Sequence, residues 1–419
     1  MQNTNSIVHK KNILPFLYAL ITIFIAFSML FWPQEIYQGA SYGLEIWATV
    51  LVPSLLPFFI LAEVLLNIGI VNMLGILLEP IMRPLFNLPG SASFVATMGF
   101  TSGFPMGAVL TKRLVEENKC TLEEGARLVA FTNNSSPLFI MTAIAIGMFN
   151  NPALGIILAI SHYLANIILG IMLGLNSPRV PALCHIDKHL ITNSIFTFLQ
   201  AHKKRKPLGR LLGDSIKSSI NNIFLIGGFV IIFSIIINIL KITSLLEFIK
   251  YPFHMILSIF GINSCLSSSL ASGFWEITLG LKEVSLSSAT LQEKAIIASV
   301  LLGWSGLSIQ AQVASVLAGS DINPHLYHKC RIFQGIIAGG IAYLLSLNVG
   351  WLSYTNIPVI STMTNILTAT HLVSSSSFFC IFTSNFIYTC KLFYFSFIAL
   401  LAVSCIALVV NSVLMIRKY

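Results

Sequence analysis

Charged residues are scarce in this sequence. They make up 9% of its 419 residues, whereas 56% are hydrophobic. A soluble protein of this length needs a charged or polar exterior, so the composition excludes that class. Lipid is the solvent that accommodates such a chain. The net charge of +9 comes from basic residues bunched between apolar stretches, which is typical of loops beside membrane spans and argues against nucleic-acid binding.

Patterns typical of redox, metal and catalytic sites are also lacking. The seven cysteines include no CxxC pair, and most lie in apolar segments, where cysteine behaves as a small hydrophobic residue. The His- and Cys-containing segments 184–189 and 325–328 fall short of metal-site spacing. We find no HExxH, Walker-type or G-x-G-x-x-G pattern and no Ser-His-Asp order. We therefore expect no enzyme, no cofactor and no metal site.

Long apolar runs dominate what is present. A spanning helix needs ~20 mostly apolar residues, and eight segments qualify: 13–32, 44–66, 125–148, 153–175, 218–240, 295–318, 332–350 and 393–416. The first is too long for a secretion signal, so we expect it to be retained. Two further stretches, 91–111 and 261–281, are each broken near the middle by Ser-Gly-Phe. Their short arms cover only ~15 Å, half the hydrocarbon thickness, so we expect re-entrant hairpins.

Lysine and arginine placement predicts the orientation. The basic positions that fall on one side of these spans are 9–11, Arg83, Lys112, Arg113, the loop 176–211, Lys329, Arg331 and 417–418. The positive-inside rule makes this side cytoplasmic, with both termini inside. The segment 241–250, which carries Lys241 and Lys250, falls outside as an exception.

An internal repeat is the most informative feature. Residues 102–104 and 272–274, 170 positions apart, both read Ser-Gly-Phe. The further matches are Lys112 with Lys282, Glu123 with Glu293, Ser135 with Ser305 and, after a two-residue insertion, 151–154 with 323–326. The two halves enter their first spans from opposite sides, so we expect an all-α polytopic membrane protein of two inverted repeats. In many secondary transporters such repeats hold the substrate at their interface.

The predicted organisation follows from these features. It comprises an N-terminal membrane anchor (1–40), a first repeat (41–175), a basic cytoplasmic linker (176–211), a second repeat (212–350), and a C-terminal loop with the last span (351–419).

Two interruptions in the first half are candidate sites. Residues 101–107, Thr-Ser-Gly-Phe-Pro-Met-Gly, break the first hairpin, and residues 133–137, Asn-Asn-Ser-Ser-Pro, break the span 125–148. Irregular backbone at membrane depth is tolerated where it is buried in protein or lines a wet cavity. The alternatives are a packing kink for the first and polar bonds between helices for the second. Ser136 and Pro137 are suited to begin a half-helix, and residues 303–306 are the matching interruption in the second half.

The chemistry of these breaks favours an anion. Half-helix N-termini present free N–H groups and the positive end of the dipole, which suit a carboxylate or phosphate. Glu276 is the most deeply embedded acid; it is either a proton or sodium site or a group at a hairpin tip near water. The candidate substrate-binding residues are Ser102, Gly103, Phe104, Pro105, Asn133, Asn134, Ser135, Ser136, Ser272, Gly273, Glu276, Ser305 and Gly306.

Three segments, 52–58, 101–108 and 132–137, resemble the sporulation integral membrane protein family (YlbJ type) of endospore-forming Firmicutes. That family carries the nucleoside-recognition, or gate, domain also found in concentrative nucleoside transporters. The resemblance covers roughly residues 40–350 and is looser in the second half, where Trp275 and Glu276 replace Pro105 and Met106.

The resemblance implies a stage V sporulation transporter of dipicolinic acid, multi-pass in the mother-cell-derived outer forespore membrane. Its partners would be dipicolinate and the lipid bilayer, with no nucleic acid; a homo-oligomer is left open. A nucleoside or other small-solute carrier is the alternative in the same class. A non-transporting sporulation scaffold is the alternative from another class, although a scaffold does not need matched interruptions.

Overall fold

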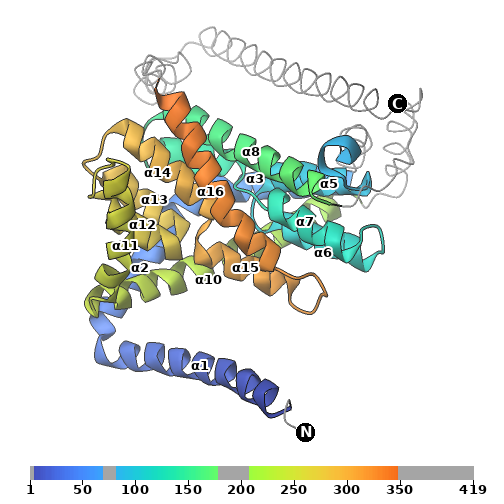
Figure 1. The fold of residues 1–419 in the computed structure, drawn as a ribbon. Helices are drawn as coiled ribbons and strands as arrows, with labels where there is room; N and C mark the ends of the chain where they lie inside the picture. Colours follow the sequence, from blue (N-terminus) through green and yellow to red (C-terminus); the bar gives the residue numbers. More distant parts are fainter. Residues whose placement is uncertain (1–3, 69–81, 178–206, 348–419) are drawn as a thin grey trace.

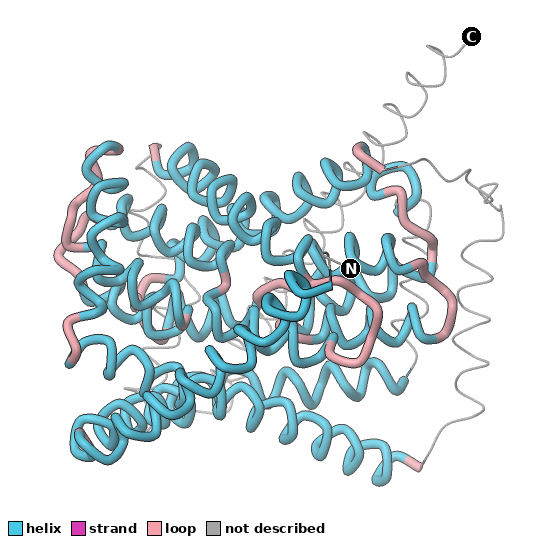
Figure 2. The backbone as a smooth tube through the Cα atoms, turned by 60° about the horizontal axis from the view of Figure 1, so that its bottom comes forward, coloured by secondary structure: helices cyan, strands magenta, loops and turns pink. Residues whose placement is uncertain are grey.

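The computed structural model describes residues 4–68, 82–177 and 207–347, and every regular element in these ranges is a helix (Figure 2). The all-α prediction is therefore confirmed for the described residues. The predicted linker falls almost wholly outside these ranges, and the predicted last span, 393–416, falls outside them entirely.

The chain begins with a helix that lies apart from the rest, α1 (Thr4–Phe31) (Figure 1). A bend of 107° separates residues 19–31 of α1 from residues 33–51. Pro33 opens α2 (Pro33–Ile46), where its missing N–H costs no hydrogen bond. From α2 the chain runs through the π-helical turn η1 (Trp47–Leu51) into α3 (Val52–Ile68). The second predicted span therefore begins about three helical turns earlier than expected, at Pro33.

A long helix from the second half, α10 (Leu208–Ile242), packs against α2 and α3. Ser234 Oγ donates to the carbonyl oxygen of Gly39 at 2.6 Å, and the Trp47 indole N–H donates to the carbonyl oxygen of Ile223 at 2.9 Å. As residue numbers rise from Gly39 to Trp47, the numbers of their partners on α10 fall from Ser234 to Ile223. The opening helices of the two halves therefore run antiparallel where they touch.

The rest of the first half follows from local helix-start signals. Thr121 and Glu124 form a reciprocal capping box, and Asn151 caps a helix whose first residue is Pro152; both are strong signals for a helix start. The helices are α5 (Ser91–Ser102), α6 (Met106–Glu116), α7 (Leu122–Thr132), the π-helix η2 (Phe139–Ile146) and α8 (Pro152–Leu175).

A similar order of helices follows in the second half. Thr290 and Glu293 form the matching capping box. Glu293 therefore corresponds to Glu124, and the predicted match with Glu123 is displaced by one residue. The helices are α11 (Leu245–Ile259), α12 (Leu266–Trp275), α13 (Ile277–Leu286), α14 (Leu291–Trp304), α15 (Gly306–Leu317) and α16 (His325–Ser346).

The last helices of the two halves, α8 and α16, also lie side by side (Figure 1). Arg331 of α16 approaches Asn166 of α8, and Gln334, further along α16, approaches His162, one turn earlier on α8. These two helices are therefore antiparallel as well. The largest buried apolar cluster draws on both halves, with Ile144 and Leu302 both fully enclosed.

Not every predicted span forms one long apolar helix in the described ranges. There, α8, α10 and the stretch Leu291–Leu317, which Ser305 interrupts, are long and apolar enough to cross a membrane, and the bent pair of residues 19–31 and 33–51 adds a fourth if it is counted as one span. The predicted span 125–148 is divided into α7 and η2, and the predicted span 332–350 corresponds to α16, which starts earlier. The several apolar helices agree with a membrane protein, and the count of eight stays a prediction.

Candidate functional site

Four interruptions of the helices lie in the two halves. In the first half the chain leaves helix at 103–105 and at 133–136; in the second half it does so at Glu276 and at Ser305. Gly103 and Ser305 have φ of +85° and +71°, a conformation in which few residues other than glycine are comfortable.

The break of the second hairpin is not where the sequence predicts it. Ser272 and Gly273 lie inside α12, and the chain leaves helical geometry only at Glu276, with φ −139° and ψ 118°. The reason is local. Trp275 stands where the first hairpin has Pro105, and because it keeps its N–H it can continue the helix. Glu276 then begins a new helix by capping it: its Oε2 accepts a hydrogen bond from the Leu279 N–H at 2.7 Å.

Within each half the two breaks pack on one another. A methyl group added at Gly103 would lie 3.0 Å from the main-chain nitrogen of Ser136, and one added at Gly306 would lie 2.9 Å from that of Ile277. Any side chain at either glycine would displace the neighbouring break. Glycine is therefore required for close approach as well as for backbone conformation.

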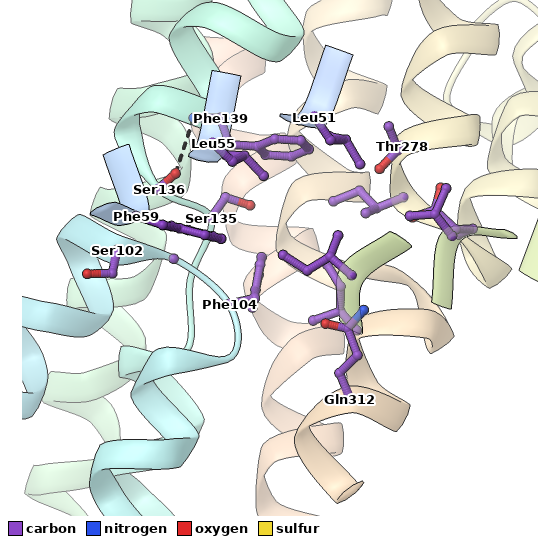
Figure 3. A pocket seen from close by; sticks show the side chains of 16 residues that line it. Leu51, Leu55, Phe59, Ser102, Phe104, Ser135, Ser136, Phe139, Thr278 and Gln312 are labelled. Carbon is purple, nitrogen blue, oxygen red and sulfur yellow. Dashed lines mark hydrogen bonds between the residues drawn. The ribbon is translucent and has the colours of Figure 1, made fainter. Parts of the chain in front are cut away.

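A cavity of about 50 Å³ lies between the halves at these breaks (Figure 3). The first half contributes Leu51, Leu55, Phe59, Ser102, Gly103, Phe104, Ser135, Ser136 and Phe139; the second contributes Ile226, Val230, Glu276, Ile277, Thr278, Ile309 and Gln312. Its wall is mainly apolar with a few polar groups, as in most small-molecule sites.

Ser135 offers the cavity an unused hydroxyl. Its main-chain N–H donates to His162 Nε2 at 3.2 Å, and its carbonyl oxygen accepts from the Tyr163 hydroxyl at 2.9 Å. Both partners are on α8, so this helix fixes the backbone of the break. The Ser135 Oγ is buried without a hydrogen-bond partner and points toward the cavity in Figure 3. A buried hydroxyl in this state favours a ligand that can bond to it.

Ser136 and Ser102 behave differently from Ser135. The Ser136 Oγ accepts from the Phe139 N–H at 3.2 Å, so it caps the half-helix as the sequence predicts. The Ser102 Oγ is also without a partner, but Figure 3 shows it turned away from the centre of the cavity.

The two hairpins present unlike groups at equivalent positions. In the second half the N-terminus of α13 is already occupied by the Glu276 carboxylate, whose other oxygen lies 3.5 Å from Ser308 Oγ. The first half has Met106 at the matching position, and no side chain caps α6. The N-terminus of α6 therefore has no side-chain cap, whereas a carboxylate already caps α13.

Arg331 binds the main chain at the first-half break but does not line the cavity. The sequence placed this residue in a cytoplasmic flank, but it is fully buried within α16. Its guanidinium donates to the carbonyl oxygens of Asn133, at 3.2 Å, and Ala130, and it stacks over Tyr327 with Cζ 5.0 Å from the ring centroid. The C-terminal carbonyls of a helix are the negative end of its dipole, so a rigid cation is well placed at the end of α7.

His162 and Gln334 meet at the interface between the halves. Gln334 lies 172 positions after His162, the same offset that separates Pro152 from Pro324. The His162 Nε2 accepts from Ser135, so a neutral ring carries its proton on Nδ1. The Gln334 amide lies 3.4 Å from Nδ1, and its assigned Oε1 has no partner. Turning this amide supplies an acceptor for Nδ1–H.

The remaining candidates lie around the cavity without lining it. Asn133 donates from Nδ2 to the Tyr327 hydroxyl at 3.1 Å, and Asn134 donates to the Phe131 carbonyl at 2.8 Å. Ser272 and Ser305 are fully buried. The other candidates outside the lining are Pro105, Gly273 and Gly306.

Sequence reasoning missed several residues that line the cavity. Gln312 could have been found, because a polar residue in an apolar span stands out in the sequence. Neither Thr278 nor the apolar residues of the cavity wall are marked by any sequence pattern. Of the weak metal patterns, 184–189 lies outside the described residues, and His328 Nδ1 is 2.8 Å from Gln310 Oε1. In the part of the chain that the structure describes, no three His, Cys, Asp or Glu side chains gather to hold a metal.

Comparisons with known proteins identify a family for this chain. The family described as "Gate: Nucleoside recognition" matches residues 48–178, the range that holds both first-half breaks. An uncharacterised protein of Alkalihalophilus pseudofirmus is 30% identical over 172 residues, 40% of this chain and 34% of that protein. No solved structure matches.

The sporulation integral membrane protein YlbJ of Bacillus subtilis is 41% identical over 334 residues, 78% of this chain and 82% of that protein. A relationship of this strength over most of both chains extends well beyond the gate region and includes the breaks of both halves. The chain belongs to the YlbJ family of sporulation integral membrane proteins.

Proposed function

We propose that this protein carries a small organic anion across a membrane by exposing the central cavity to its two sides in turn. The observation that supports this most directly is that three of the four helix interruptions line one cavity between the halves. A scaffold has no need to open its backbone at membrane depth, where each unpaired polar group is costly. Interruptions at corresponding places of two repeats are the strongest sequence indication of a transport site.

The antiparallel contacts support an inverted arrangement of the halves. Two helices related by an in-plane twofold axis run in opposite directions where they meet, as α2–α3 and α10 do, and as α8 and α16 do. Residues that touch their own equivalents lie on such an axis, and His162 and Gln334 are such a pair. We take this pair as the pivot about which the two halves move during transport. We also propose that both termini of the chain lie in the cytoplasm.

The charge around the first-half break supports an anionic solute. Within the described ranges no carboxylate pairs with Arg331, whose hydrogen bonds go to main-chain carbonyls and to Asn166. Because arginine stays protonated in proteins, a full positive charge sits directly behind Asn133–Ser136. The Ser135 hydroxyl and the half-helix that begins after Ser136 then face the solute itself.

Dipicolinate is the proposed substrate. It is a rigid dianion, and membership of a sporulation family supports this choice; we propose the outer forespore membrane as the location. A neutral nucleoside draws no benefit from an uncompensated guanidinium at the site, so the charge distribution favours the anion.

The cavity must enlarge during transport. A single water needs roughly 10–15 Å³, so about 50 Å³ holds a few waters and no aromatic dicarboxylate. We therefore assign the structure to a closed state, between the two open ones.

Flux measurements test this proposal. The full chain is reconstituted in liposomes, and uptake of radiolabelled pyridine-2,6-dicarboxylate is compared with that of uridine and with protein-free liposomes. We expect saturable dicarboxylate uptake and no nucleoside uptake. Uridine uptake alone would replace the substrate, and uptake of neither would leave the scaffold as the better description. In cells, spores that lack the gene should contain far less dipicolinate.

A further inference from the structure

A second, larger cavity lies beside the central one. Its volume is about 200 Å³. Six of its nine lining residues are polar: Gln38, Tyr42, Ser234, Asn238, Lys241 and Glu283. It is lined by α2, α10 and α13, and none of its residues belongs to the candidate set predicted from the sequence.

The two cavities follow one another along the same two helices. On α10, Ile226 and Val230 line the central cavity, and Ser234 to Lys241 line the second. On α13, Glu276 to Thr278 line the first, and Leu279 and Glu283 line the second. Seven residues of helix cover ~10 Å, so the distance from Glu276 to Glu283 is about the length of a small solute. Leu279, the next residue along α13 after Thr278, is the first to line the second cavity.

An ion pair between the helices lies in this second cavity. Lys241 Nζ is 2.9 Å from Glu283 Oε1, with the side chains 46% and 24% exposed. The other carboxylate oxygen, Glu283 Oε2, is buried and has no hydrogen-bond partner. Only one oxygen of this carboxylate is paired, so the group is held less firmly than a fully bonded one, because its buried second oxygen has lost water without gaining a donor.

We propose that this second cavity is an anion-binding station on the outward path, where the carboxylate of the solute replaces Glu283 on Lys241. The inference rests on the proposed function for its direction of travel. Each cavity then contains one carboxylate near α13. In the first, Glu276 caps the N-terminus of the helix, and in the second, Glu283 pairs with Lys241. An arriving anion releases Glu283 to water, which it already reaches in part, and takes over an ammonium group that keeps donors to spare.

The ligand class follows from the lining. Lys241 is the one cation among these nine residues, and the Tyr42 hydroxyl and Gln38 amide are neutral donors. A small mono- or dicarboxylate with an aromatic or polar body fits this combination. A cation would have to displace Lys241 from Glu283 while remaining beside its ammonium group, which like-charge repulsion disfavours.

Protection from a thiol reagent tests the station directly. Gln38, an exposed lining residue, is changed to cysteine in the full chain with its seven native cysteines replaced by serine. Labelling by 2-sulfonatoethyl methanethiosulfonate is then followed against increasing pyridine-2,6-dicarboxylate. We expect protection, with the half-protecting concentration raised about fivefold or more by Lys241→Gln, since one charge at ~4 Å is worth about that factor even in water. Glu283→Gln should lower it, because the competing anion is gone.

Matched controls keep this test decisive. Lys250→Gln and Glu247→Gln remove another ion pair, 3.1 Å long, on α11 outside the cavity, and should change nothing. Lys241→Arg keeps the charge, so its half-protecting concentration should stay within about twofold of that of the parent. If Lys241→Gln does not fold, Lys241→Arg and Glu283→Gln together carry the test. Equal protection in all variants overturns the station. If the half-protecting concentrations shift but liposomes move no anion, the binding site stands and the proposed transport function fails. If liposomes move the anion but the half-protecting concentrations do not shift, the transport function stands and the station fails.

Discussion

The guanidinium of Arg331 donates a hydrogen bond to the main-chain oxygen of Asn133 at 3.2 Å, although 198 positions separate the two residues. The bond joins α16 of the second half to the unwound end of α7 in the first. It also places a permanent positive charge behind the break that lines the cavity. The geometry of the site in one half therefore depends on a side chain from the other.

Arg331→Lys should impair both stability and transport. A lysine presents a single point donor in place of the planar fork, so one or two of the carbonyls of Ala130 and Asn133 and the Asn166 amide lose their partner. Each buried acceptor left unpaired costs about 1–3 kcal/mol. We expect a lower melting temperature in detergent and at least a tenfold loss of dicarboxylate uptake, measured on the same purified sample.

Lys329→Gln is the matched control, because Lys329 lies only two positions before Arg331 and its side chain is exposed. It removes a full positive charge from the same helix, a larger change in charge than Arg331→Lys makes, and should alter neither quantity. Normal uptake and melting in Arg331→Lys would mean that the break holds its shape without the guanidinium.

Local signals made much of the first half predictable. The Ser136–Pro137 start, the Asn151–Pro152 start and the glycine-proline break at 103–105 each rest on residues within a few positions of one another. A capping group, a missing N–H and a glycine act over one helical turn, so the sequence reveals them. In the second half the internal repeat, and not such local signals, indicated the interruption at 303–306.

Long-range relationships were not predictable in the same way. Arg331 looks like a loop residue because it precedes an apolar run, and only the approach of α7 and Asn166 reveals it as buried. The break at Glu276 was missed by a few residues, since a Ser-Gly-Phe triplet continues as helix when no proline follows it. The cavity wall is a product of packing between halves, which no pattern of spacing along one chain specifies.

Ser135→Ala should reduce transport while leaving the fold intact. The Ser135 hydroxyl has no hydrogen-bond partner, so its removal leaves no protein group unsatisfied and lowers the cost of burial. A hydrogen bond to an anion is worth about 1.5–3 kcal/mol, which corresponds to roughly tenfold or more in apparent affinity. Uptake at several dicarboxylate concentrations, together with a melting curve, measures both effects.

Ser215→Ala serves as the comparison for Ser135→Ala. The Ser215 hydroxyl is likewise buried without a partner, but on α10 away from the cavity lining. Equal uptake by the two variants would remove Ser135 from the site.

Labelling of two engineered cysteines tests the inverted arrangement. Lys119 lies in the turn between α6 and α7, and Ser285 lies near the end of α13, the equivalent hairpin of the second half. An impermeant thiol reagent should reach Lys119→Cys from the cytoplasmic side and Ser285→Cys from the opposite side. Access to both from one side would end the inverted-repeat arrangement.

The membrane potential alone is expected to drive transport. Outward movement of a dianion from an inside-negative cytoplasm is favoured by about 2.3 kcal/mol per charge for each 100 mV, so a carrier working in this direction needs no coupling ion. Glu276 then serves mainly to begin α13, where its carboxylate accepts from Leu279. Glutamine keeps that acceptor. We therefore expect Glu276→Gln to transport nearly as well as the parent, and Glu276→Leu, which loses a cap worth about 1 kcal/mol, to be less stable.

Proteoliposomes with the membrane potential clamped distinguish this from an ion-coupled mechanism. Dicarboxylate flux should follow the potential and ignore separately imposed pH and sodium gradients, in the parent and in Glu276→Gln alike. A proton or sodium ion bound at Glu276 would produce the reverse: flux would follow one ion gradient, and the glutamine variant would lose that dependence because an amide offers no ionisable oxygen. The Glu276→Leu variant separates capping from coupling, since a loss of melting temperature with the potential dependence retained assigns the carboxylate to the helix and not to an ion.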